Sequence, residues 1–266
     1  MEDIKLVLVD IDGTLLNSEE IVTEKTKKTI AKLADHHILF GIATGRTPYA
    51  VKNLVKYWGI DEYVDIIMGF NGGCYFNMHN NEMKSFYLMD GKYIPQVFED
   101  FKDFDFNPGI FDKESFHALY DDDRSRMIAG HNQLELIIDD LTSYHHKDIE
   151  KILMIAEPDV VTEMVKHYAT LDVKYKGVRT SPKLFEIFNP ALSKSKGIEE
   201  LCKDLGIPTS SVLTFGDASN DYEMIRDYIG VAMGNAYDEI KEVAKYITKS
   251  NDEDGIAYFL EEYVLK

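Results

Sequence analysis

The chain has 266 residues, of which 47 are acidic and 29 basic, so its formal net charge is −18. This acidity disfavours an extended nucleic-acid or anionic-membrane surface, but it permits a small anionic substrate beside a local metal ion or lysine. With two cysteines and no long apolar stretch, we expect neither a disulfide framework nor a membrane span. We expect a soluble cytoplasmic protein, whose oligomeric state the sequence leaves open.

The chain begins with a short apolar run that ends in a pair of acids. Residues Ile4 to Val9 predict a strand buried on both faces, and Asp10 and Asp12 follow it directly. Two carboxylates this close repel each other unless a cation or a shared proton intervenes. The pair therefore predicts a cation or a shared proton at the end of this strand.

Helices and strands then alternate along the first part of the chain. Thr23 is expected to cap a helix over residues 24–37, and an apolar run over 38–45 predicts a second strand. Pro48 suits the first turn of the next helix. A third apolar run, 64–70, leads into the turn signal Asn71-Gly72-Gly73 and then a predicted hairpin.

The last part of the chain repeats this alternation. Gly206 is expected to close a helix that begins near residue 194, and the apolar run SVLTFGD ends at Asp217. Further helices and strands alternate up to residue 264. Alternation at this spacing predicts right-handed βαβ units around a parallel sheet.

The middle of the chain, residues 88–189, differs in pattern. Its predicted strands are shorter and more amphipathic, as in an α+β layer with one hydrated sheet face, and Asp121-Asp122-Asp123 predicts a solvated turn. We interpret this segment as an inserted cap domain. The predicted fold class is therefore α/β, with a Rossmann-like parallel-sheet core over 1–87 and 190–266 and an inserted α+β cap domain over 88–189.

Polar residues stand at the carboxyl ends of several predicted strands. In a parallel sheet these ends lie along one edge, where ligands bind, so residues far apart in sequence should converge there. A lysine from the segment LSKSKG should join them. The predicted set comprises Asp10, Asp12, Thr44, Gly45, Asp217, Asn220 and Asp221.

The chemistry of this set favours phosphoryl transfer with Mg²⁺. Hard oxygen ligands without Cys or His suit Mg²⁺, which binds carboxylates, water and phosphate oxygens. The hydroxyl of Thr44 and the amides around Gly45, at a predicted helix start, can hold phosphate oxygens. A nearby lysine neutralises the transferring group, and an ionised carboxylate can attack phosphorus.

Four segments in this order, VLVDIDGT, IATGR, SKSKG and FGDASND, resemble the four motifs of the haloacid dehalogenase (HAD) superfamily of phosphatases. The Asn71-Gly72-Gly73 turn and the segments FEIFNPALSKSKGIEEL and VAMGNA are similar to its Cof-type branch, in which a large α/β cap is inserted between the second and third motifs. The resemblance covers essentially the whole chain.

The resemblance implies a role for each matched residue. Asp10 would be the nucleophile and a metal ligand, and Asp12 the acid and base that also lends its backbone carbonyl to the metal. Thr44 would bind phosphate and Asp217 would complete the metal site. Asn220 would support the phosphate and Asp221 the metal shell, although Asp221 could instead fix the lysine or a metal-bound water.

The lysine of the third motif has two candidates. Lys196 directly precedes a glycine, as in the family pattern, whereas the spacing to the following helix favours Lys194, with Ser195 in place of the glycine. We predict Lys194. Arg46 is interpreted as a structural ion-pair or helix-start residue rather than a catalytic one.

These observations predict a Mg²⁺-dependent phosphatase that acts through an aspartyl-phosphate intermediate. By resemblance, its substrates are small phosphorylated metabolites, sugar phosphates first, and a cap would close over them to exclude bulk water. Two alternatives stay open: a phosphomutase of the same fold, and a non-catalytic protein that binds phosphometabolites. The sequence does not identify the metabolite or the cap residues that select it.

Overall fold

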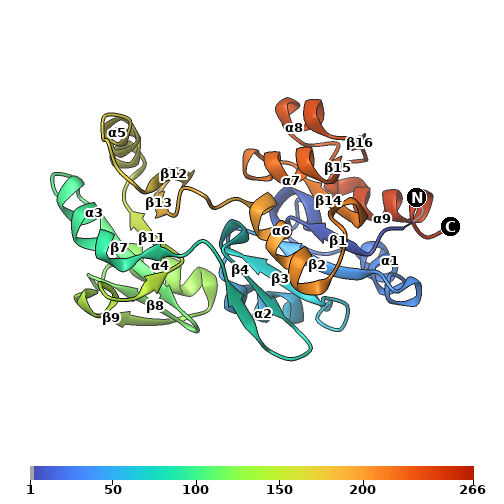
Figure 1. The fold of residues 1–266 in the computed structure, drawn as a ribbon, viewed down its shortest axis with the longest axis horizontal. Helices are drawn as coiled ribbons and strands as arrows, with labels where there is room; N and C mark the ends of the chain where they lie inside the picture. Colours follow the sequence, from blue (N-terminus) through green and yellow to red (C-terminus); the bar gives the residue numbers. More distant parts are fainter. Residues whose placement is uncertain (1–2) are drawn as a thin grey trace. The chain divides into compact units, whose positions relative to one another are not determined.

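The computed structural model describes residues 3–266 and divides the chain into two compact units (Figure 1). One unit comprises the chain up to Phe86 together with Ser193–Lys266, and the other comprises Tyr87–Leu192. The second unit is thus inserted into the first at a single point of the sequence, after Phe86. Each unit has its own hydrophobic core.

The first unit is built on an eight-stranded sheet with the order β16-β15-β14-β1-β2-β3-β4-β5. Neighbouring strands from β16 to β3 are parallel, whereas β3, β4 and β5 pair antiparallel and include the predicted hairpin. The strands span Leu6–Val9 (β1), Leu39–Ala43 (β2), Ile66–Gly69 (β3), Cys74–Asn77 (β4), Met83–Ser85 (β5), Val212–Gly216 (β14), Ile229–Ala232 (β15) and Tyr246–Ile247 (β16).

The described residues of this unit form six α-helices, whose ends follow local sequence signals. Thr23 caps the first by accepting a hydrogen bond from the backbone of Thr26, Pro48 begins the second, and Gly206 closes α6 in the left-handed conformation, as predicted. The first helix ends earlier than predicted, because a 3-10 turn at Ala34–His36 replaces its last turns. The helices span Glu24–Ala31 (α1), Pro48–Tyr57 (α2), Lys194–Leu205 (α6), Tyr222–Asp227 (α7), Asp238–Val243 (α8) and Gly255–Tyr263 (α9).

Strand β1 lies at the point where the winding of the sheet reverses. From β1 the chain proceeds through α1 to β2 and β3 on one side, whereas from β14 it proceeds through α7 to β15 and β16 on the other. Ligands of open parallel sheets bind at the carboxyl ends of the strands beside such a reversal. Figure 1 shows the blue strand β1 between β2 and β14. The binding position beside the reversal therefore lies at the end of the first apolar run, where β1 ends. The expected Rossmann-like α/β core is confirmed.

The inserted unit contains a six-stranded sheet with the order β12-β13-β11-β7-β8-β9 and a two-stranded sheet of β6 and β10. Most pairs are antiparallel, and β8 and β9 are parallel. Its helices are α3 (Ile94–Asp100), α4 (Asp123–Asn132) and α5 (Pro158–Tyr168). The strands span Met89–Asp90 (β6), Asn107–Asp112 (β7), Ser115–Ala118 (β8), Glu135–Ile138 (β9), Asp148–Ile149 (β10), Lys151–Ile155 (β11), Lys176–Ser181 (β12) and Leu184–Phe188 (β13).

One expectation for this unit is wrong in its central strands. All five residues of β11 are buried, so the hydrated sheet face predicted from amphipathicity is restricted to the outer strands β9 and β12. Lys151 in β11 is buried beside Glu186 of β13, with 2.8 Å between Nζ and Oε1. A polar residue in the central strands is therefore not always solvated, because Lys151 and Glu186 form a buried ion pair there.

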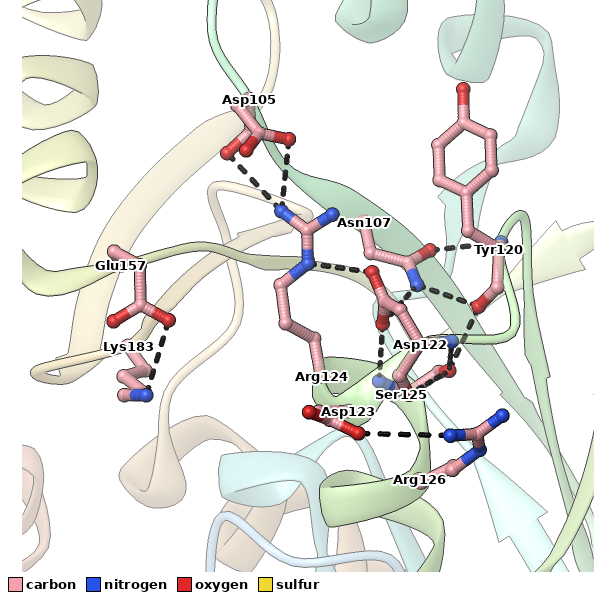
Figure 2. Close-up of polar contacts among 10 residues, drawn as sticks. All are labelled: Asp105, Asn107, Tyr120, Asp122, Asp123, Arg124, Ser125, Arg126, Glu157 and Lys183. Carbon is pink, nitrogen blue, oxygen red and sulfur yellow. Dashed lines mark hydrogen bonds and ion pairs between the residues drawn. The ribbon is translucent and has the colours of Figure 1, made fainter.

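Of the three aspartates 121–123, Asp122 and Asp123 form the start of a helix, whereas the exposed Asp121 precedes it. Figure 2 shows Asp122 as the N-cap of α4: its carboxylate accepts from the backbone of Ser125, while the Ser125 hydroxyl accepts from the backbone of Asp122. Asn107 and Arg124 also donate to the Asp122 carboxylate, at 2.9 and 2.7 Å. These bonds order the loop between β8 and α4. Among residues 3–266, no helix is long and apolar enough to cross a membrane.

Candidate active site

The centre of the site is the buried ammonium group of Lys194. Lys194 is the first residue of α6, and its Nζ atom lies 2.6 Å from Oδ1 of Asp10 and 2.6 Å from Oδ1 of Asp221. The Lys194 and Asp221 side chains are fully buried, and that of Asp10 is 9% exposed. Three residues from separate parts of the sequence therefore form one charged cluster at the end of β1.

Asp221 is held by the loop that follows β14. Its Oδ2 atom accepts hydrogen bonds from the backbone N–H groups of Asp217 and Ala218, at 3.0 and 3.1 Å. Gly216 makes room for this arrangement, because a Cβ there would lie 2.6 Å from Cβ of Asp221. Both oxygens of Asp221 are thus engaged, one by the backbone and one by Lys194.

The third carboxylate, Asp217, lies beside the turn that follows Asp10. Oxygens of Asp10, Asp217 and Asp221 all lie within 4.8 Å of one another. The hydroxyl of Thr14 donates to Oδ1 of Asp217 at 2.7 Å. Gly13 has a φ of +80°, and a Cβ on it would lie 2.4 Å from Oδ2 of Asp217, so this turn requires glycine for both conformation and space.

Burial dominates the electrostatics of this cluster. It raises the pKa of Asp10 to about 7, against the opposing effect of the Lys194 ammonium, and raises the pKa of Asp217 to about 6. Burial alone would lower the pKa of Lys194, but the carboxylates of Asp10 and Asp221 hold it above its usual value. When all are ionised, three carboxylates and one ammonium carry a net charge of −2. The cluster is therefore stabilised by an added cation.

The donor set fits a magnesium ion. It consists of carboxylate oxygens with no sulfur or imidazole, which is the ligand chemistry that Mg²⁺ prefers. Asp10 and Asp217 have carboxylate oxygens close enough to share one ion. Asp221 lies within the same range, but its oxygens already accept hydrogen bonds.

Asp12 lies outside this group of carboxylates. Its side chain is 63% exposed and pairs with Arg46, whose Nη2 atom lies 2.9 Å from Oδ1 and 3.0 Å from Oδ2. Arg46 follows β2, the strand next to β1. The ion pair expected for Arg46 is present, and its partner is the residue predicted to be the acid and base.

The remaining predicted residues lie at the same edge of the sheet. Thr44 is buried directly after β2, and its hydroxyl accepts from the backbone of Arg46 at 3.2 Å. Gly45 is half-buried, with the amide of Asn71 so close that a Cβ on Gly45 would lie 3.1 Å from Asn71 Oδ1. Asn220 is exposed in the short turn that ends at Asp221.

The two candidate lysines occupy different environments. Lys194 is buried in the cluster, whereas Lys196 is exposed and pairs with Glu199 at 3.0 Å. Ser195, which stands in place of the family's glycine, donates to Asp227 at 2.7 Å, so its hydroxyl is accommodated against α7. The helix register therefore directs Lys194 into the site.

Several contributing residues escaped the sequence interpretation. Thr14 and Asn235 support the turn after Asp10, the latter by donating to the carbonyl of Gly13 at 2.8 Å. Among residues 3–266, the buried side-chain atoms without a partner are Oγ1 of Thr47 and Oδ1 of Asn71, and both residues flank the Thr44–Arg46 segment. Thr14 and Asn235 stand within the segments VLVDIDGT and VAMGNA, so the resemblance of these segments to the family was the signal that could have identified them.

The chain is similar to known proteins over nearly its whole length. Residues 7–260 match the model of a family described as haloacid dehalogenase-like hydrolases. The chain is 32% identical to YkrA of Bacillus subtilis, provisionally named a phosphatase, with 98% of each chain covered. It is 28% identical to the 5-amino-6-(5-phospho-D-ribitylamino)uracil phosphatase YitU of the same organism, with 97% of each covered. A haloacid dehalogenase-like hydrolase from Bacteroides thetaiotaomicron has a similar structure, with a TM-score of 0.86, 25% identity, and 97% and 99% of the two chains covered.

Proposed function

The chain belongs to the haloacid dehalogenase-like hydrolases and is a phosphatase of that family, and we propose that it hydrolyses small phosphorylated metabolites with Mg²⁺ through an aspartyl-phosphate on Asp10. The observation that carries this proposal is the buried cluster in which Lys194 bridges Asp10 and Asp221 while Asp217 lies within reach. This arrangement combines a nucleophile, a fixed positive charge and oxygen ligands for a cation at the switch point of the sheet.

In the first half of the reaction, an oxygen of the Asp10 carboxylate would attack phosphorus. The P–O bond to the leaving group breaks as the bond to Asp10 forms, and the departing oxygen takes a proton from Asp12. Lys194 offsets negative charge beside the reacting carboxylate, and the Thr44 hydroxyl with the Gly45 amide would hold phosphoryl oxygens. Bound Mg²⁺, held by Asp10, Asp217 and the Asp12 carbonyl, would supply charge neutralisation and orientation of the phosphate.

In the second half, Asp12 would take a proton from a water molecule that attacks the phosphorus of the aspartyl-phosphate. The bond between phosphorus and Asp10 breaks, inorganic phosphate leaves, and both aspartates regain their initial state. In this scheme Asp221 acts through Lys194, since both of its oxygens are engaged, and Asn220 supports the phosphate from the adjacent turn.

For the substrate, we propose small phosphorylated metabolites, with sugar and polyol phosphates first. The name of YitU states that this relative acts on a phosphorylated ribityl compound. We propose that the inserted unit selects the leaving group and limits access of water. The phosphatase names among the relatives favour hydrolysis over the phosphomutase and non-catalytic alternatives.

Phosphate release from a panel of phosphorylated sugars, polyols, nucleotides and cofactors tests this proposal. The panel is run with Mg²⁺ and with EDTA, on the wild type and on Asp10→Asn. We expect hydrolysis of one or more sugar or polyol phosphates that requires both the metal and Asp10. Activity confined to nucleotides would contradict the substrate class, and a phosphoryl group returned to another position of the sugar would indicate a mutase.

A further inference from the structure

The guanidinium of Arg46 is bound to the carboxylate of Asp12 by a single nitrogen. Nη2 donates to both carboxylate oxygens, at 2.9 and 3.0 Å, across 34 positions of sequence. The two residues follow the neighbouring strands β1 and β2. This ion pair links the proposed phosphate-binding segment to the proposed acid and base, a role beyond the structural one that the sequence suggested.

Arg46 is the fixed partner of the pair. Its backbone N–H donates to the Thr44 hydroxyl at 3.2 Å, and its carbonyl accepts from the backbone of Phe70 at 3.0 Å. Gly69 packs so close that a Cβ there would lie 2.9 Å from that carbonyl. The side chain of Arg46 is 23% exposed, against 63% for Asp12. Arg46, whose backbone is held by these contacts, therefore restrains the more exposed carboxylate of Asp12.

The geometry of the contact allows the pair to open. Two parallel bonds from two guanidinium nitrogens hold a carboxylate most firmly, and burial would strengthen them. Here one nitrogen serves both oxygens, and the carboxylate is exposed, so the attraction is screened by solvent. Arg46 can thus orient Asp12 without preventing it from meeting another group.

Arg46 also has donors to spare. Within the part of the chain that the structure describes, its Nε and Nη1 atoms have no hydrogen-bond partner, whereas the Lys194 ammonium already contacts two carboxylates. Guanidinium N–H groups bind oxygen acceptors in fixed directions. The free N–H groups belong to the same planar guanidinium that holds Asp12. They can therefore donate to an oxygen that lies beside the Asp12 carboxylate.

We propose that Arg46 is a positioning residue for the leaving group: it holds the Asp12 carboxyl beside the departing ester oxygen and binds a neighbouring oxygen of the same leaving group. This inference rests on the proposed phosphatase function. As the P–O bond breaks, its electron pair stays on the ester oxygen, which takes the proton from Asp12. Leaving groups rich in hydroxyls would gain most from this arrangement.

A comparison of two leaving groups tests the role of Arg46. The substrates are p-nitrophenyl phosphate, whose phenolate departs without a proton, and the sugar or polyol phosphate that the wild type hydrolyses fastest. In Arg46→Ala we expect kcat for the sugar or polyol phosphate to fall about tenfold or more, and kcat for the aryl phosphate to change less than about threefold. Arg46→Lys should recover part of the loss. Equal losses on both substrates, or none, would overturn the proposal.

A double-mutant cycle separates action through Asp12 from a structural effect. Because part of the effect of Arg46 passes through Asp12, Arg46→Ala should slow hydrolysis of the sugar or polyol phosphate by a smaller factor in the Asp12→Asn background than in the wild type. An equal factor of loss in both backgrounds would contradict the proposal. Arg126→Ala, which removes another exposed arginine–aspartate pair, is the matched control, and thermal denaturation shows whether each variant folds. A wild type that releases no phosphate from either ester would refute the proposed function itself.

Discussion

The Lys194 ammonium contacts the Asp10 carboxylate at 2.6 Å although 184 positions separate the two residues in sequence. Asp10 directly follows the first strand, and α6 begins at Lys194 just after the inserted unit. The contact places a positive charge directly beside the carboxylate of the proposed nucleophile. It also means that the electrostatics of the site depend on both segments of the core.

Asp10→Asn removes the proposed nucleophile while keeping the shape of the side chain. We expect phosphate release to fall below about a thousandth of the wild-type rate, because the amide does not attack phosphorus. The fold should persist, since the change relieves repulsion among buried carboxylates. Release of phosphate from p-nitrophenyl phosphate and the melting temperature are measured together. Asp35→Asn, in an exposed turn, is the control, and substantial turnover by Asp10→Asn would exclude the covalent mechanism.

Lys194→Ala should be far more harmful than Lys196→Ala. Loss of the buried ammonium leaves Asp10 and Asp221 facing each other, so the free energy of unfolding without metal should fall by about 3–5 kcal/mol. Lys196 is exposed, and its removal should cost less than about 0.5 kcal/mol. Urea denaturation gives the stabilities, and phosphate release gives the activities. The opposite ranking would mean that Lys196 is the motif lysine.

Metal dependence should be complete and pH-linked. EDTA should abolish phosphate release and added Mg²⁺ should restore it. Burial raises the pKa of Asp10 to about 7 and of Asp217 to about 6, so the folded protein keeps protons that the unfolded chain has already released. The stability of the metal-free protein should therefore fall as pH rises from about 4 to about 7.

Mg²⁺ should offset this loss, because it binds the deprotonated carboxylates. The increase in melting temperature caused by Mg²⁺ should thus grow over the same pH range. Asp217→Asn removes one of the two carboxyl groups whose pKa is raised. In this variant, both the stability of the metal-free protein and the Mg²⁺-induced increase in melting temperature should depend less on pH. A Mg²⁺ effect that is constant with pH would indicate that the ion binds elsewhere.

Gly13→Ala should weaken the metal site through a steric effect. The new Cβ would lie 2.4 Å from Oδ2 of Asp217, so the carboxylate must move, and we expect Mg²⁺ affinity to fall by about 10- to 100-fold. Gly206→Ala is a matched control, because Gly206 also has a positive φ but open space around it. Titration of activity with Mg²⁺ compares the two. Equal effects would show that backbone strain alone is responsible.

The sequence predicted the architecture where local signals coincide with it. Thr23, Pro48 and Gly206 act within one helical turn of their own position, so the ends that they set were predictable. Apolar runs that end in Asp10 and Asp217 likewise predicted which edge of the sheet carries polar groups. The order of strands, with β14 beside β1, is a property of the whole chain, and the handedness of βαβ units does not determine it.

Contacts between two turns were beyond the sequence. Nothing in the segment IATGR shows that Arg46 pairs with Asp12, because the distance between the turns depends on the twist and register of β1 and β2. The role of Asp122 was hidden for a related reason. Three consecutive aspartates suggest solvation, and only the position of Ser125 and Asn107 makes the middle one a cap.

The insertion of Tyr87–Leu192 imposes an order on folding. Strand β1 has β2 on one side, which follows within about forty residues, but its other neighbour, β14, begins at Val212. During synthesis, the contiguous inserted unit can complete its own core while one edge of β1 still has no partner. The nascent sheet therefore exposes an apolar strand edge until β14 emerges, and an unpaired edge of this kind favours aggregation.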